Sequence, residues 1–165
     1  MKREKKIYPL AGGITTADTF AVLGDAQNFK KRKHAWKVWK ALKEFGCVVY
    51  PVTADLKRLD GSKVYSNLSE LMDKVTVVVP CLLPEQLQSL VSDAAAVKAG
   101  TIWFQTKTWT QEFQAECERK AIAVVRGCVL QHVSYSPFSL CYFNPCYWHG
   151  LRAAKVPAKR YNRWG

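Results

Sequence analysis

The link between the first apolar run of the chain and its first amphipathic segment carries residue types that bind phosphate. Gly24 ends the run, and Asp25, Ala26 and Asn28 follow it. A glycine at the end of a strand lets backbone amides approach a phosphate, and the N-terminus of a following helix favours negative charge. The dinucleotide fingerprint GxGxxG is absent, because Gly24 has no glycine two or five residues later, and Asp25 would repel a tightly held pyrophosphate. This link therefore disfavours an NAD-type site.

A run of basic residues follows the link and is expected to enter the first helix. It reads Lys30-Lys31-Arg32-Lys33-His34. Cations at a helix N-terminus oppose the helix dipole, so the run predicts either an anionic ligand at the same place or full solvation of its charges. The expected position at the mouth of a binding crevice favours the ligand.

Patterns for catalysis or metal binding are missing from the sequence. The chain has three histidines and six cysteines, but it has no CxxC pair and no zinc-ligand spacing. No Ser-His-Asp arrangement or catalytic pair of carboxylates stands out either. Three of the cysteines lie within apolar runs, which predicts reduced, structural thiols. We therefore expect neither an enzyme nor a metal site.

The elements that must position the phosphate-binding residues alternate between two periodicities. Short β-rich apolar runs predict five strands, at residues 19–23, 47–52, 75–80, 101–105 and 121–125. Apolar residues at helical spacing predict helices from Trp36 to Phe45, from Pro84 to about Lys98 with a stop at Gly100, and over residues 110–119. Strands that alternate with helices of this length form βαβ units. The predicted fold is α/β: a Rossmann-like three-layer sandwich with a five-stranded parallel sheet and an irregular, aromatic-rich C-terminal tail.

The strand ends of such a sheet should converge on one crevice, because ligands bind at the carboxyl edge where the strand order reverses. Pro51-Val52-Thr53 ends the second strand and Lys57 follows, and a basic residue there suits a phosphorylated ribose. Asp55 and Asp60 lie nearby, and acidic residues at this position would instead favour a ribose with free hydroxyl groups. Val79-Pro80-Cys81-Leu82-Leu83-Pro84 leaves the third strand and predicts either an apolar wall for a base or a packed turn.

The excess of positive charge lies at the two ends of the chain. The 165 residues include 25 basic and 13 acidic side chains, a formal net charge of +12. Residues 1–43 carry 11 basic against 3 acidic side chains, residues 44–133 carry 9 against 10, and residues 134–165 carry 5 against none. Such ends attract polyanions such as nucleic acid, anionic lipid or a phosphorylated cofactor, unless they serve only as a solvated surface.

Composition and patterning also predict the organisation of the chain. With 48% hydrophobic residues the chain is expected to be a globular protein. It contains no run of about 18 apolar residues, so the sequence predicts no transmembrane helix. No secretory signal is recognisable, which predicts a cytoplasmic location. Residues 1–17 form an expected N-terminal arm, residues 18–133 the binding domain, and residues 134–165 a basic extension with eight aromatic residues. Such a tail packs on its own domain or on a partner subunit, so a homodimer is a hypothesis.

Six short motifs occur along residues 18–133 in an order known from one family. They are Ala21-Val22-Leu23-Gly24, Pro51-Val52-Thr53, Gly61-Ser62-Lys63-Val64-Tyr65-Ser66-Asn67-Leu68, Val79-Pro80, Trp103-Phe104-Gln105 and Gly127-Cys128-Val129. Together they resemble the small stand-alone coenzyme A-binding proteins, which are similar to the N-terminal domain of the succinyl-CoA synthetase α subunit. The resemblance implies a Rossmann-like domain that binds coenzyme A at the carboxyl edge. It also implies phosphates near residues 24–34 and adenosine near residues 51–53 and 79–84.

The chain departs from the family's pattern at the phosphate end. Asp25-Ala26 stands where the family has Ala-Ser, His34-Ala35 replaces Pro-Ser, and Thr53 replaces an asparagine. Groups that would hydrogen-bond the phosphates are therefore absent, and the charges of residues 30–33 would have to substitute for them. The residues expected to contact the ligand are Gly24, Asp25, Ala26, Asn28, Lys33, His34, Ala35, Pro51, Val52, Thr53, Lys57, Val79, Pro80, Cys81 and Gln105.

The function expected from these observations is non-enzymatic binding of coenzyme A or an acyl-CoA. The alternative is a nucleic-acid-binding module that uses the basic ends and the aromatic tail. An NAD(P)-linked oxidoreductase is the third alternative, which the missing glycines and catalytic groups disfavour.

Overall fold

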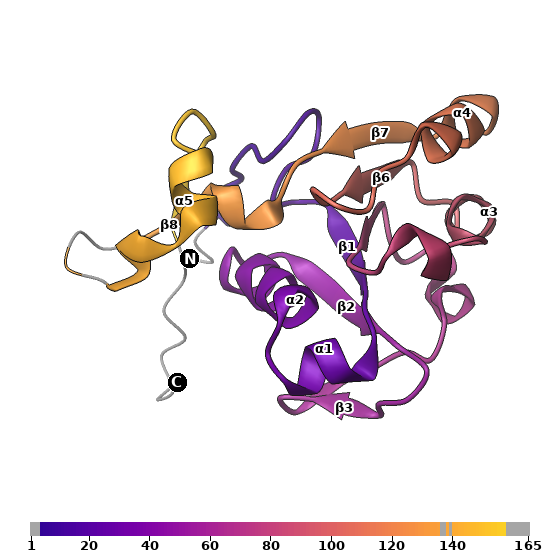
Figure 1. The fold of residues 1–165 in the computed structure, drawn as a ribbon, viewed down its shortest axis with the longest axis horizontal. Coiled ribbons are helices and arrows are strands. Elements are labelled where there is room, and N and C mark those ends of the chain that lie inside the picture. Colours follow the sequence, from indigo (N-terminus) through magenta and orange to yellow (C-terminus); the bar gives the residue numbers. More distant parts are fainter. Residues whose placement is uncertain (1–3, 136–137, 139, 158–165) are drawn as a thin grey trace.

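A parallel five-stranded sheet forms the centre of the computed structural model, which describes residues 4–135, 138 and 140–157 (Figure 1). The strands are β1 (Thr19–Leu23), β2 (Val48–Val52), β5 (Val77–Pro80), β6 (Thr101–Phe104) and β7 (Ala123–Arg126). Their order is β2-β1-β5-β6-β7, and every neighbouring pair is parallel. The chain leaves β1 towards β2 and then returns to add β5, β6 and β7 on the other side. The order of the strands therefore reverses between β1 and β5.

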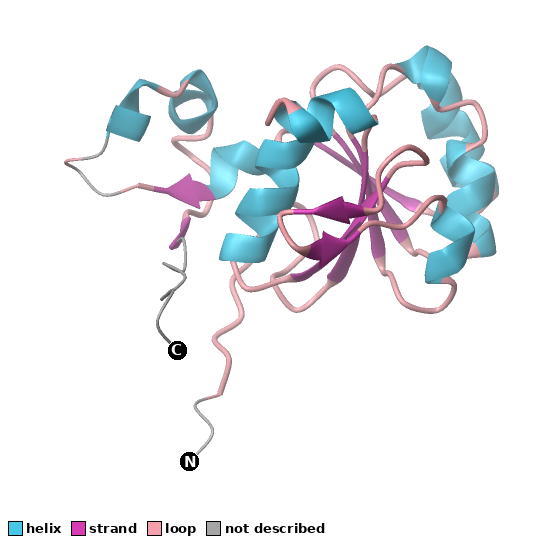
Figure 2. Ribbon diagram, turned by 90° about the horizontal axis from the view of Figure 1, so that it is seen from below, coloured by secondary structure: helices cyan, strands magenta, loops and turns pink. Residues whose placement is uncertain are grey.

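Helices cover both faces of this sheet, so the molecule has three layers (Figure 2). On one face α2 (His34–Glu44) and the 3-10 turn η3 (Val129–His132) pack against Phe20, Val22 and Trp103. On the other face α3 (Leu90–Ala96) and α4 (Gln111–Arg119) pack against Ala21 and Val78. Alternate residues of β1 thus enter opposite cores, as expected for a strand buried on both faces. The Rossmann-like α/β fold is confirmed, with each predicted strand within two residues of its place.

The predicted helix from Pro84 to Lys98 is wrong, because this segment forms two elements. A 3-10 turn, η2 (Pro84–Gln86), comes first, and α3 begins only at Leu90. The Gln86 side chain accepts a hydrogen bond from the backbone N–H of Leu83, and the N–H of Leu87 bonds back only three residues to Pro84. These bonds close a separate turn before the α-helix begins. At the other end α3 stops at Ala96, and Lys98, with φ +62°, adopts the left-handed conformation two residues before Gly100, where the stop was expected.

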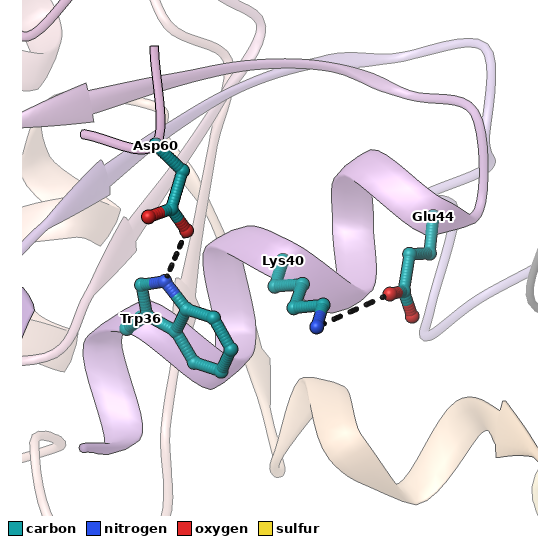
Figure 3. A network of polar contacts seen from close by, with 4 residues as sticks. All are labelled: Trp36, Lys40, Glu44 and Asp60. Carbon is teal, nitrogen blue, oxygen red and sulfur yellow. Dashed lines mark hydrogen bonds and ion pairs between the residues drawn. The ribbon is translucent and has the colours of Figure 1, made fainter. Parts of the chain in front are cut away.

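A small hairpin between β2 and β5 packs on the outer face of α2. It consists of β3 (Arg58–Leu59) and β4 (Ser62–Lys63), which are antiparallel. Its two-residue tip, Asp60-Gly61, has φ values of +45° and +83°, which is the backbone of the Asp-Gly turn that hairpins favour. The Trp36 indole N–H donates to the Asp60 carboxylate at 2.8 Å and fixes the tip against the helix (Figure 3).

The described part of the C-terminal tail packs on the same domain. It contains β8 (Val133–Ser134), the 3-10 turn η4 (Leu140–Phe143), α5 (Pro145–His149) and β9 (Val156–Pro157), and β8 pairs with β9. The Lys155 ammonium donates to the carbonyls of Gln131 and Tyr147, which links the tail to η3. Tyr161 and Trp164 lie outside the described residues. Within the described part of the chain, every helix is too short or too polar to cross a membrane.

Candidate functional site

Gly24 allows the end of β1 to approach two helices closely. A Cβ atom at this position would lie 2.7 Å from the Cβ of Ala35 and 2.9 Å from the ring of Phe29. Either distance is well inside van der Waals contact, so any larger residue would push the helices away from the strand. The Gly24 N–H donates to the Val52 carbonyl at 3.2 Å, which extends the β1–β2 pairing by one residue. The glycine is therefore a packing requirement at the carboxyl edge of the sheet.

Asp25 caps a short helix that the sequence did not predict, α1 (Ala26–Lys30). Its carboxylate accepts the backbone N–H of Asn28 at 2.7 Å and also accepts the Asn28 side-chain amide. The anion at this helix N-terminus is thus a side chain of the protein. At the next helix, α2, the N-cap residue Lys33 makes no side-chain capping hydrogen bond to the first turn.

The sequence predicted that the basic run enters one helix. In the structure the run instead spans the end of α1 and the start of α2. Lys30 is the last residue of α1, where a cation is favourable for the helix dipole, and Lys33 precedes α2. Arg32 lies between the two helices with its guanidinium 5.2 Å from the centre of the Trp36 ring. Within the described structure, none of residues 30–33 lines a hollow at the carboxyl edge.

Two adjoining hollows follow the carboxyl edge. The first, here called the main cavity, has a volume of about 490 Å³ and is lined from the loops after β1, β5, β6 and β7. The second, the side groove, has about 340 Å³ and lies beside the ends of β1 and β2. Asp25, Leu82 and Gln86 line both. Together the two hollows form one cleft at the point where the strand order reverses, which is where ligands of such sheets bind.

The expected ligand-contacting residues divide into three groups in the structure. Lining the main cavity are Asp25, Asn28, His34, Cys81 and Gln105. Lining the side groove are Gly24, Asp25, Val52 and Thr53. Lining neither hollow are Ala26, at the start of α1, the exposed Lys33 and Lys57, and the buried Ala35, Pro51, Val79 and Pro80.

The sequence did not single out several residues that line the main cavity. Lys107 brings a cation to the wall from the loop after β6, and its position two residues beyond Gln105 was the available signal. Leu82 and Leu83, in contrast, belong to the run after the third strand that was predicted as an apolar wall, and they do line the main cavity. Cys146 reaches the wall from α5, and nothing in the local sequence pattern predicts that the tail returns to this edge.

Gln105 organises the loops around the main cavity. Its side-chain oxygen accepts the Val129 N–H at 3.0 Å, and its amide donates to the carbonyls of Trp103 and Gly127, each at 3.3 Å. The residue is almost fully buried and so joins the ends of β6 and β7. Burial lowers the pKa of His34, an effect that a hydrogen bond with Gln105 partly opposes. The imidazole is therefore neutral near pH 7.

The buried thiols of the main cavity stay protonated. Burial raises the pKa of Cys128 to about 12 and raises that of Cys81 even further. A thiol is a nucleophile only as the thiolate, so both side chains act as small apolar groups in the wall. In the described part of the structure no group of three His, Cys, Asp or Glu side chains is arranged to hold a metal ion.

Comparison with known proteins identifies the family. The coenzyme A binding domain model matches residues 18–133. A hypothetical protein from Pyrococcus horikoshii is 27% identical, with 68% of this chain and 78% of that chain covered and a TM-score of 0.62. A protein from Thermus thermophilus is also 27% identical, with coverage of 68% and 85% and a TM-score of 0.61.

A more distant similarity extends to a large enzyme. The dinucleotide-forming acetyl-coenzyme A synthetase 1 of Candidatus Korarchaeum cryptofilum is 20% identical over 65% of this chain and 25% of that chain, with a TM-score of 0.55, which shows a shared fold. The match of the family model, together with the cleft at the switch point of the sheet, places the chain in the family of coenzyme A binding domains.

Proposed function

We propose that this chain binds coenzyme A, or an acyl-coenzyme A, in the cleft formed by the main cavity and the side groove, without changing the ligand chemically. The observation that carries the proposal is the position of the two hollows, which adjoin at the carboxyl edge beside the reversal of the strand order. Membership of the coenzyme A binding domain family supplies the identity of the ligand. Coenzyme A is long, and a cleft of two connected hollows suits a ligand of that shape.

The lining of the cleft suits the three parts of coenzyme A. The side groove offers the apolar Leu68 and the hydroxyl of Thr53 to the adenosine. The uncapped first turn of α2 and the Lys107 ammonium provide positive potential for the phosphates. The main cavity combines the apolar Leu82 with the amide of Asn28, which matches the mixed polarity of the pantetheine arm.

Binding without catalysis is supported by the state of the nucleophilic groups. The two buried thiols of the main cavity are protonated, and the neutral His34 is engaged by Gln105. Neither Cys81 nor Cys128 is placed to attack an acyl group as a thiolate. In the proposed complex the two thiols form part of the cavity wall beside the thiol or thioester end of coenzyme A.

The test is a calorimetric titration of the full chain with coenzyme A. We expect saturable 1:1 binding that the variant Lys107→Glu weakens by about tenfold or more, because it reverses a charge at the cavity wall. The matched control is Lys120→Glu at the end of α4, which lines neither hollow. Absence of coenzyme A binding, or an equal loss in both variants, would refute the proposed site.

A further inference from the structure

A third hollow lies on the outer face of α2, away from the cleft. It has a volume of about 610 Å³ and is here called the tryptophan groove. The lining residues are Arg32, Trp36, Trp39, Lys40, Lys43, Glu44 and Asp60. Figure 3 shows four of them, Trp36, Lys40, Glu44 and Asp60. It shares no residue with the main cavity or the side groove. Coenzyme A bound in the cleft would therefore not occupy this hollow.

The cations of the tryptophan groove are held in place by indole rings. The Arg32 guanidinium and the Lys40 ammonium lie 5.2 and 4.8 Å from the centre of the Trp36 ring. The Lys43 ammonium lies 4.8 Å from the centre of the Trp39 ring and also donates to the Ser62 hydroxyl at 3.0 Å. Contact with an indole positions a cation and leaves its charge in place. The groove therefore presents ordered positive charge.

Two acidic residues, Asp60 and Glu44, also line the groove and offset part of this charge. Asp60 accepts the Trp36 N–H, and Glu44 meets Lys40 at 3.8 Å in an ion pair that is exposed to solvent. Exposed pairs at this distance contribute little attraction. The lining keeps a net charge of +1, and the exposed Lys33 and Lys37 of the same segment add further positive charge beside it.

Positive charge continues on both sides of the groove. Lys33 and Lys37 are exposed one helical turn apart at the start of α2. On the hairpin, Arg58 and Lys63 stand directly opposite each other across the two strands. The Arg58 guanidinium donates to the Gly61 carbonyl at 3.2 Å, and the Lys63 ammonium lies 4.6 Å from the centre of the Tyr65 ring, so each cation is positioned by a neutral group. The helix alone is about 16 Å long, so the charged surface is longer than one phosphate group needs.

We propose that the tryptophan groove binds a single-stranded nucleic acid, with the cations on its phosphates and Trp36 as a stacking surface for a base. Single-stranded nucleic acid is bound in this way, by a basic track with aromatic rings beside it. Trp36 is only partly buried, and a base that stacks on its ring would displace Arg32 or Lys40 from the ring towards the neighbouring phosphates. A membrane fits less well, because the large exposed apolar side chains of the described residues all lie outside the groove.

The test measures binding of fluorescein-labelled 12-mers of dT and rU to the full chain by anisotropy over a range of salt concentrations. The variant R32A/K40A/K43A removes three groove cations. The control R119A/K74A/K120A removes the same residue types from exposed positions elsewhere. We expect the groove variant to lose about tenfold or more in affinity near 0.1 M salt. Its slope of log K against log salt should fall by about 2, while the control stays near the wild type.

A second variant guards against misfolding. Arg32 has φ +52°, a left-handed conformation that glycine adopts without strain, so Arg32→Gly removes one cation while relieving the backbone. It should bind the oligonucleotides severalfold more weakly without loss of thermal stability. The binding of coenzyme A should be unchanged in every groove variant, which separates this proposal from that for the cleft.

Four results would overturn the proposal. They are equal losses in the groove and control variants, no oligonucleotide binding at 0.1 M salt, and displacement of the oligonucleotide by millimolar inorganic phosphate alone. The fourth is binding to phosphatidylserine vesicles in the absence of oligonucleotide binding.

Discussion

Asp25 is the residue at which this chain and its family's pattern conflict most directly. Its carboxylate caps α1 and lines both hollows of the cleft, so it holds a negative charge where phosphates are expected to bind. Asparagine caps a helix as well as aspartate does. We therefore expect Asp25→Asn to change the free energy of unfolding by about 0.5 kcal/mol or less. Removing the repulsion should raise the affinity for coenzyme A by about three- to tenfold.

The measurement is a pair of calorimetric titrations at one salt concentration. Asp73→Asn is the matched control, because it removes a carboxylate that lines neither hollow of the cleft. An unchanged or lower affinity in Asp25→Asn would show that the phosphates do not approach α1. An equal gain in both variants would show that only the overall charge matters.

At the scale of elements, the strands were predictable and the short helices were not. Continuous apolar runs such as residues 19–23 and 101–104 are buried on both faces, and this burial is what the sequence pattern records. The existence of α1 depends instead on one local contact, the Asp25 carboxylate with the N–H of Asn28. The break between η2 and α3 likewise depends on one side-chain bond from Gln86. A single polar contact leaves no periodic signal in the sequence.

The residues of the candidate site also divide into those that the sequence pattern predicts and those that it does not. Residues at strand ends, such as Val52 and Gln105, were predictable because parallel strands must bring their carboxyl ends to one edge. Cys146 and the tryptophan groove were not, because both depend on how distant segments pack. The groove joins the outer face of α2 to a hairpin tip 24 residues further along, through the Trp36–Asp60 hydrogen bond.

The packing of the tail on the domain depends on Gly150. A Cβ atom there would lie 2.5 Å from the Gln131 carbonyl oxygen and 2.6 Å from the Gln131 Cβ. We expect Gly150→Ala to cost about 1–3 kcal/mol and to separate α5 from η3. Gly13→Ala is the control, because a Cβ at Gly13 meets nothing within 4 Å. Urea unfolding measures the cost, and limited proteolysis reports the release of the tail. Equal stability of the two variants would contradict this packing.

At the scale of the whole molecule, two partly or fully buried histidines should make stability depend on pH. Burial lowers the pKa of His34 and of His132, whose Nδ1 lies 3.1 Å from the Ala154 carbonyl oxygen. Both are neutral in the folded and unfolded chain well above pH 6.5. Below that pH the unfolded chain binds protons that the folded chain resists, so the free energy of unfolding falls as the pH falls. The loss begins near the unfolded pKa of about 6.5 and continues down to the lowered folded values.

Urea denaturation at pH 7.5 and pH 5.5 measures this dependence, because carboxylates with ordinary pKa values remain ionised over that range. Each histidine contributes at most about 1.4 kcal/mol per pH unit. His132→Gln should reduce the difference in the free energy of unfolding between the two pH values; His149→Gln, at an exposed position on α5, is the matched substitution. His132 packs edge-to-face on the buried Trp103 of β6, with the ring centres 5.7 Å apart. Protonation of His132 would therefore destabilise the core that supports the carboxyl edge of the sheet. A pH dependence that survives in His132→Gln and vanishes in His34→Gln would assign the effect to the cleft instead.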